Sequence, residues 1–102
     1  MLDRYIWGKV KRISPEAPVP VLKVSAENLS PGGAANVALN LKSLGANVEL
    51  HGVIGNDYEG EKLVELLKQI EINPKGIIHD PKRPTTTKTR LIAESQQITR
   101  VD

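Results

Sequence analysis

The strongest constraint on the fold is a change in the spacing of apolar residues at a glycine-containing turn. Before the turn, Val19 and Val21 follow the two-residue spacing of a strand. Ser30-Pro31-Gly32-Gly33 is a turn by composition. After it, the spacing becomes three and four residues, as in a helix, at Ala34, Val37, Ala38, Leu41 and Leu44. Gly45 lies where a glycine commonly ends a helix. The sequence therefore predicts a strand, a turn and a helix in this order.

Strands and helices continue to alternate after Gly45. Val48 to Ile54 is an apolar run of strand length, and Asp57 is a plausible N-cap for a second helix that closes at Asn73-Pro74. The buried stripe of this helix is predicted at Leu63, Val64, Leu66, Leu67 and Ile70. Gly76 to Ile78 resembles another short strand. This alternation favours an α/β fold with a parallel sheet, in a chain of 102 residues that forms one domain at most.

Both flanks of this region have a different character. Residues Met1 to Ile13 show no clean period, and no strand is predicted there. Prolines 15, 18 and 20 indicate an edge strand or a strand that leaves the main sheet, because proline cannot donate a ladder hydrogen bond. Near the other end, Thr85 to Ile92 and Gln96 to Val101 are rich in β-branched residues, and Ala93-Glu94-Ser95 would connect them as a hairpin.

Composition excludes several kinds of protein. The formal net charge is +2 and the basic residues are scattered, so we expect no nucleic-acid partner, although a site for one small anion stays open. Without cysteine, and with His51 far from His79, we expect no metal site. No run approaches the roughly 18 apolar residues of a membrane span, and no signal peptide is apparent. We therefore expect a cytoplasmic protein with no membrane partner.

The segment from Pro31 to Ala38 carries the most chemistry. Two glycines at a helix start let the backbone approach a ligand closely, and the free N–H groups of the helix end can receive ligand oxygens. Asn36, one turn in, offers both a donor and an acceptor, which suits sugar hydroxyls. Taken alone, Gly32-Gly33 is equally consistent with a simple turn.

The spacing around this segment resembles a known signature. Asn36-Val37-Ala38, then Gly45, then Gly55, followed by the turn from Gly55 to Gly60, resembles the N-terminal signature of the PfkB or ribokinase-like carbohydrate kinases. The resemblance is specific over residues 32 to 60. It implies a ribokinase-like α/β fold, here a partial parallel sheet with flanking helices plus a small β lid.

Four further segments resemble one branch of this superfamily, the D-glycero-β-D-manno-heptose-7-phosphate kinases. They are Met1 to Tyr5, Arg12 to Val21, Thr87 to Arg90 and Gln96 to Asp102. The resemblance implies a parent enzyme that uses ATP and Mg²⁺ to phosphorylate the anomeric oxygen of the sugar phosphate, in ADP-heptose and lipopolysaccharide core biosynthesis. Two alternatives stay open: a related kinase with another sugar substrate, and a non-catalytic module that binds sugar phosphate or dimerises through its lid.

The resemblance also implies the site residues. Asp3 matches the aspartate that bonds sugar hydroxyls, and Gly32, Gly33 and Asn36 match the helix-terminus part of the same pocket. Lys88 and Arg90 share one face of a strand, which suits a phosphate contact. Arg12, Gln97 and Arg100 are weaker candidates for that contact. Read without the resemblance, Asp3 is also consistent with a solvated acid, and Lys88 with Arg90 is consistent with a solvated strand face.

The resemblance finally implies what this chain holds of the kinase domain. Residues 1–102 correspond to the N-terminal sugar-binding part, with lid segments at about 12–25 and 85–102. In many members the lids of two subunits pair, so a homodimer through the β lid is expected. The family's catalytic base lies in a later Gly-Ala-Gly-Asp stretch that this sequence lacks. We therefore expect no catalytic residue here, no first strand and no ATP-binding part, and no ATP or Mg²⁺ bound by these residues alone.

Overall fold

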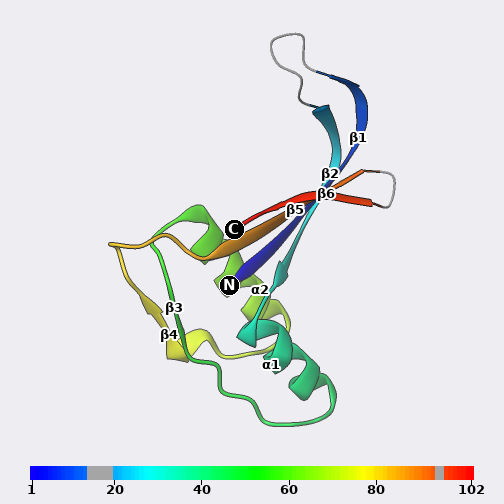
Figure 1. Cartoon of the computed structure of the whole chain (residues 1–102). Helices are drawn as coiled ribbons and strands as arrows, with labels where there is room; N and C mark the ends of the chain where they lie inside the picture. The colour runs from blue at the N-terminus through cyan, green and yellow to red at the C-terminus, as the bar shows by residue number, and fades with distance from the viewer. Residues whose placement is uncertain (14–19, 94–95) are drawn as a thin grey trace. The chain divides into compact units, whose positions relative to one another are not determined.

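The computed structural model describes residues 1–13, 20–93 and 96–102, and it divides into two compact units. Unit 1 consists of Met1–Asp3 and Ser30–Thr87, and unit 2 consists of Arg4–Leu29 and Lys88–Asp102. Figure 1 labels the helices and strands of both units. The interpretations that concern Pro15, Pro18 and the connection at residues 94–95 lie outside the described residues.

Unit 2 is formed mainly by a four-stranded sheet. The strand order of this sheet is β2-β1-β5-β6. The strands are β1 (Leu2–Ile13), β2 (Pro20–Pro31), β5 (Thr87–Ala93) and β6 (Gln96–Val101). The expectation of no strand in the first dozen residues is wrong, because β1 lies between β2 and β5. The strands on both sides of β1 supply partners for its backbone hydrogen bonds. This stabilisation outweighs the lack of alternating apolar residues in its sequence. β2, with Pro20 and Pro31 at its two ends, is an end strand of this sheet, as the prolines predicted.

β5 and β6 form the predicted antiparallel pair. Thr89 pairs with Val101, Arg90 with Arg100 and Leu91 with Thr99, before a shift in register between Leu91 and Ile92. Elsewhere in the sheet, Gly8 of β1 packs directly on the Lys23 backbone carbonyl of β2. A side chain at Gly8 would collide with that carbonyl, so the close approach of the two strands requires glycine there.

Unit 1 contains the two helices and a short parallel sheet. Its elements are α1 (Ala34–Ser43), β3 (Gly52–Ile54), α2 (Tyr58–Gln69), the 3-10 turn η1 (Pro74–Gly76) and β4 (Ile77–His79). β3 and β4 are parallel, with Gly52 opposite Ile77 and Ile54 opposite His79, so the predicted parallel pairing is confirmed. The strand predicted over Val48 to Ile54 is limited to its last three residues, because β4 offers only three positions for pairing.

Both helices end in a Schellman motif. After α1, Gly45 (φ 90°) donates to the Lys42 carbonyl at 2.9 Å and Ala46 donates to Leu41 at 3.1 Å, which confirms the predicted glycine stop. After α2, the equivalent left-handed position is Glu71 (φ 60°), and Ile72 donates to the Leu67 carbonyl at 2.9 Å. Because Glu71 carries a Cβ, this position is strained where Gly45 is not.

Burial distinguishes the two helices. In α2, Leu63 and Leu67 are fully buried, as the predicted stripe requires, while Val64, Leu66 and Ile70 are half-buried. In α1 the buried residues are Ala35 and Ala38. The apolar residues whose spacing predicted this helix are largely exposed, with Val37 at 56%, Leu41 at 46% and Leu44 at 85%. The periodicity therefore identified the helix correctly, but the helix packs through its two small alanines.

Candidate functional site

The first candidate site lies in unit 1, where the start of β1 meets the N-terminus of α1. The carboxyl group of Asp3 packs against Gly32 so closely that a methyl group there would lie 2.7 to 2.8 Å from its atoms. The Gly32 N–H donates to the Met1 carbonyl at 2.9 Å. Gly32 is therefore needed for close approach, and the structure brings Asp3 and Gly32 together as the resemblance implied.

Gly33 and Asn36 continue this site into the first turn of α1. Gly33 is the N-cap residue with φ 56°, a value that favours glycine, and among the described residues no side chain caps the helix. Gly33 and Asn36 are both exposed. The positive end of the helix dipole, a carboxylate acceptor and an amide can together bind the hydroxyl groups of a polyol.

A second arrangement in unit 1 fixes the turn from Gly55 to Gly60. The Asp57 Oδ1 atom accepts from the Gly60 N–H at 2.8 Å, which confirms Asp57 as the N-cap of α2. Asp57 also accepts from the hydroxyl of Thr85 at 2.6 Å and from its backbone N–H at 2.8 Å. The Gly55 N–H in turn donates to the Thr85 hydroxyl at 2.9 Å. We call Gly55, Asp57, Gly60 and Thr85 the Asp57 clamp.

The clamp assigns Asp57 a structural role. Hydrogen bonds from Thr85 hold the pKa of the Asp57 carboxyl below its ordinary value. A carboxylate with lowered pKa and three donors is suited to hold a turn and poorly suited to accept a proton in catalysis. Thr85 is buried, and sequence reasoning missed its role because it lies 28 residues after Asp57 in a run of threonines.

The second candidate site lies on the sheet of unit 2. Lys88 and Arg90 alternate along β5, and Arg100 of β6 lies directly opposite Arg90. These three side chains share one face of the sheet, and we call them the β5–β6 cation cluster. The Arg90 guanidinium lies 5.3 Å from the centre of the Tyr5 ring and donates to its hydroxyl at 3.4 Å. A face with three cations can bind the oxygens of a phosphate group.

The predicted site residues therefore fall into two groups. Asp3, Gly32, Gly33 and Asn36 belong to unit 1, whereas Lys88 and Arg90 belong to unit 2. All members of each group lie in the same unit. Arg100, a weaker candidate from the sequence, joins the second group through the strand register.

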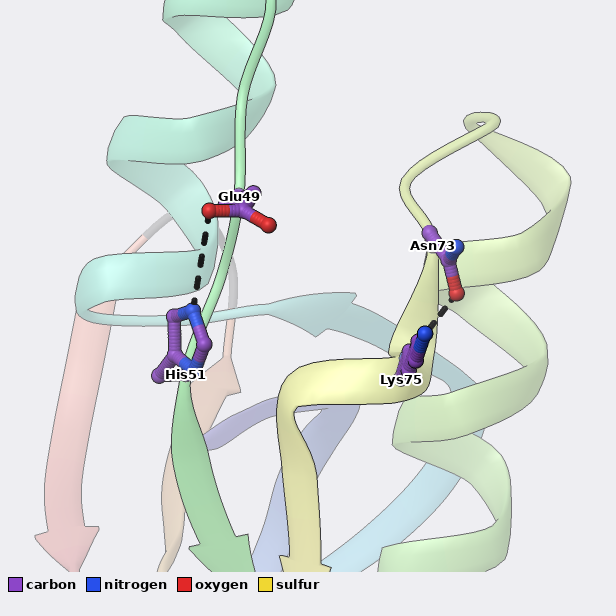
Figure 2. A network of polar contacts seen from close by, with 4 residues as sticks. All are labelled: Glu49, His51, Asn73 and Lys75. Atoms are coloured by element: carbon purple, nitrogen blue, oxygen red, sulfur yellow. Dashed lines mark hydrogen bonds and ion pairs between the residues drawn. The ribbon is translucent and has the colours of Figure 1, made fainter.

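A separate hollow of 380 Å³ lies in unit 1 between the segment before β3 and η1. Figure 2 shows Glu49 and His51 on one side and Asn73 and Lys75 on the other. The His51 Nε2 atom lies 3.9 Å from the Glu49 carboxylate, and both side chains are mostly exposed. The Asn73 side-chain Oδ1 atom accepts from the Lys75 backbone N–H at 2.9 Å. These contacts are local and solvated, so the hollow offers less to a ligand than the two sites above.

The resemblance implied ATP and Mg²⁺ as cofactors of the parent enzyme. Within residues 1–13, 20–93 and 96–102, no three His, Cys, Asp or Glu side chains are grouped to hold a metal ion. Across the same part of the chain, none of the helices has the length and apolar character to cross a membrane.

The fold is that of the ribokinase-like kinases, and the chain belongs to the pfkB family of carbohydrate kinases, whose model matches residues 2–101. Over 100 residues it is 56% identical to the bifunctional protein HldE of Helicobacter acinonychis, and over 102 residues 49% identical to that of Sulfurimonas denitrificans. These matches cover 98% and 100% of the chain. The chain spans only 22% and 21% of the length of these two relatives.

Solved structures show the same fold. Ribokinase of Arabidopsis thaliana, complexed with ribose and ATP, superposes with a TM-score of 0.73 at 15% identity, over 98% of this chain and 32% of that one. An uncharacterized sugar kinase of Pyrococcus horikoshii in complex with ATP gives a TM-score of 0.65 at 26% identity, over 98% of this chain and 31% of that one. The expected family and the ribokinase-like fold are confirmed.

Proposed function

We propose that this chain provides the sugar-binding part of a carbohydrate kinase whose parent phosphorylates D-glycero-β-D-manno-heptose 7-phosphate at its anomeric oxygen with ATP and Mg²⁺. The observation that carries the proposal is the contact of the Asp3 carboxyl with Gly32 at the N-terminus of α1. This contact supports the proposal because a carboxylate beside a helix N-terminus suits the binding of hydroxyl groups. The relatives named bifunctional protein HldE support the choice of a heptose phosphate, and with it a role in ADP-heptose and lipopolysaccharide core biosynthesis.

In this proposal each unit contributes one kind of substrate contact. Asp3, Gly32, Gly33 and Asn36 are assigned to sugar hydroxyls, and the β5–β6 cation cluster is assigned to the phosphate that the substrate already carries. The lid segments expected at about 12–25 and 85–102 fall largely in unit 2, and we propose them as the lid of the parent enzyme. A closing lid excludes water, which protects ATP from hydrolysis in the parent enzyme.

The proposal is tested by comparing heptose 7-phosphate with unphosphorylated heptose, using NMR titration of the 102-residue chain. Asp3→Asn is expected to weaken binding of both sugars. Lys88→Ala with Arg90→Ala is expected to weaken binding of the phosphorylated sugar at least about tenfold and leave the other unchanged, because charge-assisted contacts to the phosphate are lost.

Lys82→Ala with Arg83→Ala is the matched control, since it removes the same charge from two exposed residues of unit 1. If this control weakens binding of heptose 7-phosphate as much as Lys88→Ala with Arg90→Ala does, the phosphate assignment is wrong. If Asp3→Asn binds both sugars as tightly as the unchanged chain, the sugar assignment is wrong. ATP turnover by the chain alone is expected to be undetectable.

A second candidate function is a module that dimerises through the lid. In the sheet that the structure describes, β2 and β6 are the end strands, and end strands present backbone groups to a partner. Unit 2 also exposes apolar side chains that favour association with a partner: Trp7, Val10, Val24, Ile98 and Val101. Analytical ultracentrifugation tests this interface: a dimer that Val24→Lys and Ile98→Lys convert to a monomer supports the lid interface. A chain that is monomeric at every concentration contradicts it.

A further inference from the structure

Asp102 occupies a defined place beside the β5–β6 cation cluster. Its Oδ2 atom accepts from Arg100 Nη2 at 2.7 Å, with both side chains about half exposed. Asp102 directly follows Val101, the last residue of β6, which pairs with Thr89 of β5. The contact with Arg100 therefore brings the carboxylate to the β5–β6 cation cluster.

The electrostatic effect of the cluster on this carboxylate is direct. The hydrogen bond from Arg100 is the largest of the causes that lower the pKa of Asp102, and the charges of Lys88 and Arg90 add to it. Asp102 is thus held as an anion in the place where an anionic ligand would be attracted. Its negative charge offsets one of the three positive charges that a phosphate group would meet.

We infer that Asp102 is an internal competitor for the phosphate-binding face: its carboxylate engages Arg100 until a phosphate group displaces it. This inference rests on the proposed function, in which the β5–β6 cation cluster binds the substrate's phosphate. The competition lowers the affinity for any anion held through charge alone.

The size of the effect follows from Coulomb's law. A carboxylate at about 6 Å from a bound dianion in a solvated site repels it enough to weaken binding about tenfold at low salt. Because the face is solvated, dissolved ions screen this repulsion, and the effect shrinks as the Debye length falls below the separation. Competition by Asp102 thus predicts how much phosphate affinity changes when the Asp102 charge is removed. It also predicts that this change becomes smaller as the salt concentration rises.

The test measures inorganic phosphate binding to the 102-residue chain by isothermal titration at low salt and at an alkaline pH, where phosphate is mostly the dianion. Asp102→Asn removes one charge and keeps the shape, and it is expected to bind phosphate about tenfold tighter, with the gain lost at high salt. Asp102→Glu should restore the weak binding. Glu65→Gln is the matched control, because Glu65 also forms an exposed ion pair, 3.3 Å from Lys62, and it should leave phosphate binding unchanged.

Two different results would overturn two different statements. If Asp102→Asn binds phosphate no more tightly than the unchanged chain or than Glu65→Gln, Asp102 is not a competitor. If Asp102→Asn binds phosphate tightly and adding Lys88→Ala with Arg90→Ala makes no difference, the anion binds elsewhere. In that case the phosphate assignment of the proposed function fails together with the inference.

Discussion

Removing the hydroxyl of Thr85 tests whether the Asp57 clamp holds unit 1 together. In Thr85→Val the side chain keeps its branched shape but loses the hydroxyl that donates to Asp57 at 2.6 Å and accepts from the Gly55 N–H at 2.9 Å. Thr85 is only 6% exposed, so water has little access to the N–H group that loses its acceptor.

The expected loss follows from these two contacts. A hydrogen bond to a charged group contributes about 1.5–3 kcal/mol, and a buried donor without an acceptor costs about 1–3 kcal/mol. The contributions overlap, so Thr85→Val should lower the free energy of unfolding by roughly 2–4 kcal/mol. Losses of this size are a large fraction of the total stability of a small domain.

The measurement is urea unfolding followed by far-UV circular dichroism. The midpoint of Thr85→Val should fall by about 1 M or more, with little change in the slope. Thr85→Ser keeps the hydroxyl and should lose only about 0.8 kcal/mol for the missing methyl group. Thr86→Val is the control, because the Thr86 side chain is exposed. A Thr85→Val loss as small as that of Thr86→Val, within about 0.5 kcal/mol, would refute the structural role of the clamp.

Two further predictions concern the same unit. Because Thr85 lowers the pKa of Asp57 below its ordinary 3.8, the clamp stabilises the fold fully above that value and loses its contribution as pH falls through the lowered pKa. Unfolding free energies measured across the acid range should show this fall, and an Asp57→Asn chain with the same acid dependence would contradict it. Glu71→Gly should raise the unfolding free energy by about 0.5–1 kcal/mol, because glycine relieves the positive φ of 60° after α2. A drop in the urea midpoint would show that Glu71 is not strained, and Lys68→Gly, inside the helix, should be destabilising.

Much of the fold could be predicted because it depends on local chemistry. Gly45 ends α1 since a left-handed residue is needed there, and Asp57 begins α2 since its carboxylate satisfies a free N–H of the first turn. The parallel pairing of β3 and β4 follows from alternating strands and helices. The grouping of Asp3 with Gly32 was implied by the family resemblance, which periodicity alone does not contain.

What the sequence by itself determined is therefore the order of elements, their caps and the chemistry of the candidate residues. Only the tertiary structure decided which residues meet. β1 is a strand because β2 and β5 flank it, and α1 is buried through Ala35 and Ala38 although its larger apolar residues define the period. Thr85 reaches Asp57, and Asp102 joins the face of Lys88 and Arg90 through Arg100. These outcomes depend on strand register and packing between segments distant in sequence, and no local propensity encodes such distances.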